Sequence, residues 1–295
     1  MNSLWVVFTL LGAVGQTARN AMQRELTPRL GALGATLVRF LFGFPFALLF
    51  LAAVLGVTGE KLPPLNGTFA LWISVGAVTQ IAATALMLLT MEQRSFVVTV
   101  AYLKTEPLLV ALLGLAFLGD ALSGMSALAI FIAMTGVALI SIKPDALVGG
   151  LKPALLGISS AALFALSAIG YRGAILALPA PGFVLPATFS LAVGLALQTF
   201  LLLAWMLLFQ RRTLSATIAL WRPSLLAGFA GAAGSQMWFL AFALATAAHV
   251  RTLALVEVLL AQGVSRFVFK QKTSLHEAAG IALLVAGAIL IVWSD

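Results

Sequence analysis

The sequence predicts an all-α integral membrane protein with ten transmembrane helices, arranged as two inverted five-helix repeats. The chain of 295 residues is 62% hydrophobic and only 9% charged, whereas soluble domains carry about a quarter charged residues. It divides into ten apolar runs, each near the roughly 20 residues that a membrane-spanning helix needs. A shift of 151 residues along the chain also places Glu106 on Glu257 and Gly136 on Gly287 without a gap. The two halves therefore read as copies of one unit.

The expected helices follow one another with short connections. Their continuous apolar runs differ from the short alternating strands of a membrane barrel, and helices satisfy all their backbone hydrogen bonds within lipid. The first run is interpreted as a membrane span and not a cleaved signal, because it lacks a basic leader. The expected helices cover residues 3–22, 33–56, 67–90, 96–118, 123–142, 153–178, 183–209, 223–247, 249–269 and 274–293.

The linker at 143–153 divides the chain into a first repeat at 1–145 and a second at 146–295. Because each repeat has an odd number of helices, the second should run in the opposite direction, as in many secondary transporters. The connections that follow odd-numbered helices hold most of the Lys and Arg residues. Positive charge stays in the cytoplasm, so both termini are expected in the periplasm.

Several classes of chemistry are excluded by composition and motifs. The chain has no cysteine, so disulfides, thiolate metal sites and thiol nucleophiles are absent. It has no phosphate-binding loop for ATP and no HExxH zinc motif around His276. The net charge of +8 arises beside the ends of apolar runs, where basic residues orient helices in a membrane. We therefore expect no enzyme activity, catalytic residue, metal, cofactor or nucleic-acid partner.

Two glutamates, Glu106 and Glu257, lie midway along expected helices. A charge inside a bilayer costs about 2.5–3.5 kcal/mol on insertion scales and tends to be functional. We expect the pair to line a central cavity, one from each half, and to bind a substrate amine or a proton. The structural alternative is an ion pair of Glu106 with Arg39 or Lys104, although residues two apart point away from each other on a helix. Lys104 is either a coupling charge or a side chain that reaches the inner membrane face.

Other polar and aromatic residues complete the expected site. Pro107 is the expected hinge, since a proline interrupts helical hydrogen bonding. Helix packing and hydrogen bonds between helices are the alternative role for each remaining candidate. The candidate substrate contacts are Gln80, Thr84, Tyr102, Trp238 and Phe239. The residues interpreted as anchors or solvated groups near helix ends are Arg19, Arg39, Arg172, Arg251, Arg266, His249 and His276.

The segment 106–140 resembles the fourth and fifth helices of the drug/metabolite transporter superfamily, in its EamA-type branch. The shared features are Pro107 within a helix, the Gly119-Asp120 pair at the turn, and Gly136 in the next helix. Arg39 near the start of the second helix also resembles that family. The second half departs from the pattern, because Val258 stands at the proline position.

The resemblance implies a ten-helix exporter in a bacterial inner membrane, similar to bacterial aromatic amino-acid exporters. We expect a monomeric secondary transporter that exports small organic solutes, amino acids among them, by alternating access around a midplane cavity lined by helices 1, 3, 4, 6, 8 and 9. Three alternatives stay open. A proton-coupled exporter of cationic drugs or guanidinium-type compounds would use the glutamates. A carrier of phosphorylated metabolites would need several basic residues in the cavity. A lipid-modifying enzyme would need clustered carboxylates or a metal site at one membrane surface.

Overall fold

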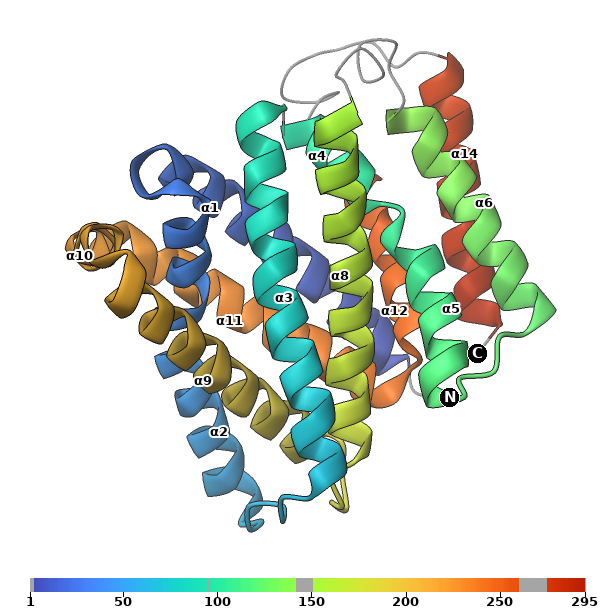
Figure 1. Cartoon of the computed structure of the whole chain (residues 1–295). Helices are drawn as coiled ribbons and strands as arrows, with labels where there is room; N and C mark the ends of the chain where they lie inside the picture. The colour runs from blue at the N-terminus through green and yellow to red at the C-terminus, as the bar shows by residue number, and fades with distance from the viewer. Residues whose placement is uncertain (1–2, 95, 142–150, 260–274, 295) are drawn as a thin grey trace.

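The computed structural model (Figure 1) describes residues 3–94, 96–141, 151–259 and 275–294, and every regular element among them is a helix. Six helical stretches in this part are long and apolar enough to cross a membrane, and two shorter apolar helices accompany them. The all-helical, multi-pass expectation is confirmed there. The helices are α1 (Leu4–Leu41), α2 (Phe44–Thr58), α3 (Gly67–Gln93), α4 (Phe96–Leu103), α5 (Glu106–Leu118), α6 (Gly124–Ser141), α8 (Leu151–Leu176), α9 (Val184–Phe209), α10 (Arg211–Ala219), α11 (Trp221–Leu244), α12 (Ala247–Leu253), the short 3₁₀ helix η1 (Ala254–Val256) and α14 (Leu275–Trp293).

The expected loop between residues 22 and 33 is wrong. Helix α1 continues through this region and turns only at Gly31, whose φ of 66° is left-handed. Glycine adopts that conformation without the steric cost that a Cβ would add. A second break precedes α2, which carries Pro45 in its first turn. Arg19 consequently lies in the middle of a long helix and not at its end.

The expected helix 96–118 is also interrupted. Helix α4 ends at Leu103, and α5 begins at Glu106 with Pro107 in its first turn. Pro107 has no N–H to donate to the carbonyl group of Leu103, and its ring would clash with that carbonyl. In the second half, α12 passes into η1 immediately before Glu257. Both glutamates therefore follow a break in α-helical geometry. Residues 260–269 of the expected helix 249–269 lie outside the described residues.

The bundle is built from long helix pairs (Figure 1). Helix α3 packs along α8, α1 along α11, and α6 along α14. Helices α6 and α14 run antiparallel, and their backbones approach closely at glycines. A Cβ added to Gly136 would lie 2.5 Å from the backbone nitrogen of Leu284, and one added to Gly287 would lie 2.6 Å from that of Ala133. Small residues permit this close packing of membrane helices.

Both ends of the chain meet at His249. Its ring lies edge-on to Trp5 with centroids 6.2 Å apart, and its Nε2 atom lies 3.4 Å from Oγ of Ser294. The N- and C-termini accordingly lie at the same end of the bundle (Figure 1). The expectation of a solvated histidine is wrong, because His249 is only 5% exposed.

Candidate functional site

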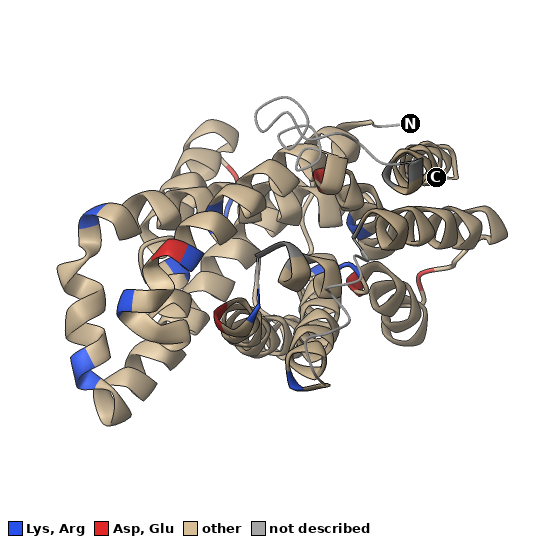
Figure 2. Ribbon diagram, turned by 90° about the horizontal axis from the view of Figure 1, so that it is seen from above, with Lys and Arg blue, Asp and Glu red and all other residues tan. Residues whose placement is uncertain are grey.

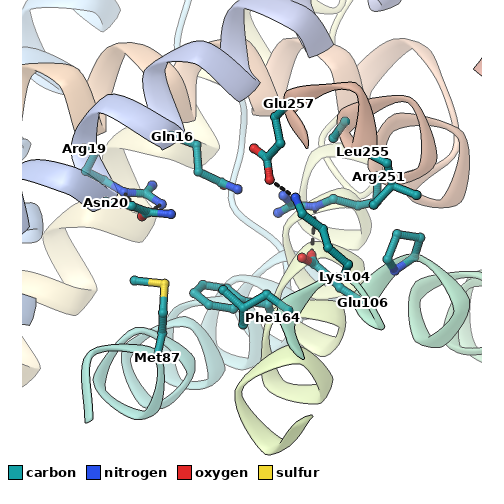
Figure 3. Close-up of a pocket in the computed structure, with 13 residues that line it drawn as sticks. Gln16, Arg19, Asn20, Met87, Lys104, Glu106, Phe164, Arg251, Leu255 and Glu257 are labelled. Atoms are coloured by element: carbon teal, nitrogen blue, oxygen red, sulfur yellow. Dashed lines mark hydrogen bonds and ion pairs between the residues drawn. The ribbon is translucent and has the colours of Figure 1, made fainter. Parts of the chain in front are cut away.

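Charged residues are sparse, but some of them lie inside the bundle as well as at its edges (Figure 2). The interior charges surround a cavity of about 40 Å³ (Figure 3). This volume holds only a few water molecules. Side chains from α1, α3, the α4–α5 break, α8 and the α12–η1 segment line it. They are Gln16, Arg19, Asn20, Met87, Leu103, Lys104, Glu106, Pro107, Phe164, Arg251, Ala254, Leu255 and Glu257.

The first ion pair in the cavity joins Lys104 to Glu257 (Figure 3). The two side chains are only 10% and 11% exposed. Thr17 lies 3.5 Å from the second carboxylate oxygen of Glu257. The break between α4 and α5 turns Lys104 inward, so it does not extend to the membrane face. This contact links the first half of the chain to the second.

The second ion pair joins Glu106 to Arg251, with 3.0 Å between Oε1 and Nε. The guanidinium group of Arg251 also lies 4.4 Å from the centre of the Trp238 ring and 5.4 Å from that of Phe242. The anchor role expected for Arg251 at a membrane surface is therefore wrong. Helix α12 is buried along its whole length, which carries Arg251 into the interior. Glu106 forms no ion pair with Arg39 or with Lys104, which precedes it in the break between α4 and α5.

Arg19 is the third basic side chain in the cavity wall, and it is 2% exposed. Its Nε and Nη2 atoms donate to Oδ1 of Asn20 at 3.2 and 2.8 Å. The anchor role expected for Arg19 at a helix end is wrong, because α1 extends well beyond it. Gln16, Arg19 and Asn20 are spaced i, i+3 and i+4, which places all three on one face of the helix. That spacing is the signal by which the sequence could have revealed this wall of the cavity.

Gln80 and Thr84 lie on α3 but are absent from the cavity lining. Oε1 of Gln80 accepts hydrogen bonds from Tyr171 at 3.0 Å and from Gln198 at 2.9 Å. Thr84 accepts one from the buried Arg39 at 3.1 Å, so Arg39 is not the interfacial anchor that was expected. Both residues share a face with Met87, which does line the cavity. A helix rises about 1.5 Å per residue, so Gln80 lies about 10 Å along the helix axis from Met87.

The three candidate aromatic residues are absent from the cavity lining. Tyr102 packs on α8, where a Cβ added to Gly157 would meet its ring at 2.6 Å. The Phe239 ring lies 4.6 Å from that of Tyr171. The Trp238 ring contacts the guanidinium group of Arg251 and does not line the cavity. Of the predicted site residues, the structure thus brings together Lys104, Glu106, Pro107 and Glu257.

Arg172 forms a separate polar clamp near the end of α8. Its Nε and Nη2 atoms donate to the two carboxylate oxygens of Asp120, each at 3.2 Å. Its Nη1 atom donates to the backbone carbonyls of Phe242 at 2.6 Å and Ala245 at 2.5 Å. The clamp ties the α5–α6 turn to the end of α11. Arg172 is consequently an interhelical link and not the membrane anchor expected from its position.

Comparisons with known proteins agree with this architecture. The model of the EamA-like transporter family matches residues 3–142. A comparison with curated proteins gave no match. Among solved structures 27 chains match. One of them, titled only "Crystal structure of protein", is 14% identical, covers 98% of this chain and 96% of its own, and has a TM-score of 0.67. That likeness shows a shared fold. Together with the apolar helices, the match of the first half to the EamA-like transporter family indicates a multi-pass membrane protein related to transporters of small solutes.

Proposed function

We propose that this protein is a secondary transporter that exports small organic solutes, amino acids among them, by alternating access. The observation that carries the proposal is the pair of cross-half contacts in one buried cavity. Lys104 of the first half pairs with Glu257 of the second, and Glu106 of the first pairs with Arg251 of the second. Buried ions are costly in a membrane and tend to mark solute pathways. A rocking motion of the halves would alter both pairs at once.

Contacts between α6 and α14 support the inverted-repeat arrangement. Gly136 packs on Leu284, and Gly287 packs on Ala133. The 151-residue shift converts one of these contacts into the other, because it relates Ala133 to Leu284 as well as Gly136 to Gly287. The antiparallel course of α6 and α14 agrees with a two-fold axis in the membrane plane.

The discontinuous helices favour a moving part at the level of the glutamates. Transporter sites are often formed by membrane helices that break near the middle of the bilayer. Here the break at Lys104-Thr105 lies beside Pro107, and the 3₁₀ turn η1 lies beside Glu257. Because α-helical geometry is already interrupted at these breaks, the adjoining helix ends can tilt without disrupting a continuous helix. We assign Pro107 as the hinge on this basis.

The charges of the cavity favour amino acids over cationic drugs. Each carboxylate already has a basic partner, and Arg19 adds a further positive charge to the wall. A cationic solute would have to displace a bound cation and would still face the excess positive charge. A zwitterion supplies a carboxylate for that excess and an ammonium group for Glu257 or Glu106. Charge balance therefore supports a solute with both groups.

A carrier of phosphorylated metabolites is the second candidate. It is favoured by the three basic residues that line the cavity, Arg19, Lys104 and Arg251. Arginine and lysine are the usual phosphate ligands. Inorganic phosphate is accordingly included as a probe below. A lipid-modifying enzyme receives no comparable support, since no group of three or more His, Cys, Asp or Glu residues suited to a metal occurs within the described ranges.

The proposed setting is a bacterial inner membrane with both termini in the periplasm and the protein acting as a monomer. The contacts of His249 with Trp5 and Ser294 support the placement of the termini on one side. The end of α3, which is capped by Arg94, and helix α10, which begins with Arg211 and Arg212, lie away from the chain termini (Figure 1). The positive-inside rule favours the cytoplasm for that side.

Efflux from proteoliposomes tests the transport function. Purified protein is reconstituted in vesicles loaded with labelled phenylalanine, leucine or glucose 6-phosphate, with or without a proton gradient. We expect amino-acid efflux faster than from protein-free vesicles and inhibition by excess unlabelled amino acid. The double variant Glu106→Gln with Glu257→Gln should lose this efflux. If the wild-type protein moves none of these solutes under any gradient, the proposed function is wrong.

A further inference from the structure

We propose that Arg19 is an anion subsite within the cavity and binds the carboxylate group of the transported solute. This inference deepens the proposed transport function and rests on it. The starting observation is the burial of the Arg19 side chain in the cavity wall, across from the two ion pairs (Figure 3). Its hydrogen bonds go to one neutral oxygen, Oδ1 of Asn20.

Arg19 differs from the other two basic residues of the cavity in its partners. Lys104 and Arg251 each contact a carboxylate. No carboxylate of the described residues forms an ion pair with Arg19. The remaining N–H groups of its guanidinium include both of those on Nη1, because the bonds to Asn20 come from Nε and Nη2. The cavity wall therefore holds one positive charge more than its carboxylates balance.

A buried charge without a counterion is destabilising. A bound anion would supply the missing counterion. The planar fork of arginine matches the two oxygens of a carboxylate or a phosphate. A carboxylate is the better fit to a cavity whose opposite wall carries Glu106 and Glu257, because a dianionic phosphate would be repelled by them while an ammonium group on the same solute would be attracted.

Helix α11, which packs along α1, leaves room for the aliphatic part of the Arg19 side chain. A Cβ added to Gly231 of α11 would lie 3.2 Å from Cδ of Arg19 and 3.5 Å from Cγ of Arg39. The absence of a side chain at Gly231 thus leaves room for the aliphatic parts of Arg19 and Arg39. This packing holds the aliphatic part of Arg19 while its guanidinium group faces the cavity. The subsite is consequently a preorganised feature of the fold.

The inference makes a specific statement about substrates. Solutes with a free α-carboxylate should bind, and otherwise identical solutes with a neutral amide should not. Phenylalanine should therefore stabilise the protein more than phenylalaninamide or 2-phenylethylamine does. Leucine and leucinamide form a second pair that differs only in the same group. Inorganic phosphate is the probe for the other source of anionic oxygen.

The test measures ligand-induced thermal shifts of the purified full-length protein in detergent, because a ligand of the folded state raises its apparent stability. The variants are Arg19→Gln, which removes the charge, and Arg19→Lys, which keeps the charge without the fork. Arg222→Gln is the matched control, since it removes one positive charge from an exposed position on α11. Loss of a charge-assisted hydrogen-bonded contact should weaken amino-acid binding about 10- to 100-fold in Arg19→Gln, with Arg19→Lys between it and the wild type.

The melting temperature of ligand-free Arg19→Gln separates the two roles of Arg19. A structural role predicts a lower melting temperature than that of the wild type, whereas an anion subsite does not. Without a carboxylate partner, Arg19→Gln should melt at the wild-type temperature or above it. A lower melting temperature with unchanged amino-acid binding would mean that Arg19 supports the fold, and the inference would be wrong. It is also overturned if the amides bind as well as the amino acids, if no carboxylate shifts the wild-type protein, or if phosphate alone gives an Arg19-dependent shift.

Transport assays separate this inference from the proposed function. If the wild-type protein and Arg19→Gln export phenylalanine with the same KM and the same preference over phenylalaninamide, transport stands and the subsite falls. If neither exports any solute but phenylalanine shifts only proteins that retain Arg19, the subsite stands and the transport proposal falls.

Discussion

Lys104 and Glu257 are 153 residues apart in the chain and form an ion pair inside the membrane bundle. Each lies at a break in its helix, and each belongs to a different half of the sequence. The contact therefore connects the two halves of the chain inside the bundle. Glu106 and Arg251 form a second such contact in the same cavity, so the pairs can be expected to respond together to any motion of the halves.

Loss of one partner of the Lys104–Glu257 pair should be more harmful than loss of both. Lys104→Met leaves a buried carboxylate unbalanced, and Glu257→Gln leaves a buried ammonium group unbalanced; each should reduce stability by about 3–5 kcal/mol. The double variant should recover most of that loss but not transport. Thermal unfolding in detergent and proteoliposome efflux give the two readouts. Additive destabilisation in the double variant would argue that the pair is not coupled.

Trp238 should act through Arg251 and not as a wall of the cavity. Its ring lies 4.4 Å from the guanidinium carbon, and such a cation–π contact contributes about 1–2 kcal/mol when desolvated. Trp238→Phe should retain most transport, whereas Trp238→Leu should reduce it strongly. In a background that lacks the Arg251 charge, the two substitutions should differ much less. Equal effects in both backgrounds would assign Trp238 to simple packing.

Pro107→Ala should stiffen the α4–α5 segment. Alanine restores an N–H that can bond to the carbonyl group of Leu103, and it removes the clash of the proline ring with that carbonyl. We expect a higher melting temperature and slower transport. Pro223→Ala is the control, because Pro223 also lies in the first turn of its helix, α11, but does not line the cavity. Unchanged transport in Pro107→Ala would remove its assignment as a hinge.

The Asp120–Arg172 clamp should control access from the side of the chain termini. Asp120→Asn weakens a two-point contact with Arg172, which would leave its bonds to Phe242 and Ala245. The protein has no cysteine, so a single Gln16→Cys substitution gives a clean accessibility probe in the cavity. A membrane-impermeant maleimide should label it faster in the Asp120→Asn background. Equal labelling rates in both backgrounds would show that the clamp does not limit access.

The glycines between α6 and α14 should be equally sensitive. Gly136→Ala and Gly287→Ala each place a Cβ against the partner backbone, so both should destabilise the protein by similar amounts. Gly56→Ala is the control, because nothing lies within 4 Å of the added atom. In that exposed helical position alanine should be stabilising by about 0.5–1 kcal/mol. A large difference between Gly136→Ala and Gly287→Ala would weaken the two-fold relation.

Several site residues could be predicted because their chemistry is local. Glu106, Glu257 and Lys104 stand out as charges within apolar runs, and Pro107 disrupts a helix wherever it occurs. By contrast, Arg19 and Arg251 looked like surface anchors because their depth depends on where helices begin and end. The first helix extends past Arg19 and turns only at Gly31, and the burial of α12 places Arg251 in the interior. Neither boundary has a strong sequence signal.

Apolar length and sparse charge are enough to specify a multi-pass helical membrane protein, since lipid leaves backbone groups no partner except those within the helix. The same one-dimensional information places charges at mid-depth without saying which of them meet. Partners such as Lys104 and Glu257 were selected by the packing of helices that are distant in sequence. Tertiary contacts therefore decided which basic residues are neutralised and which one, Arg19, still faces the cavity without a carboxylate among the described residues.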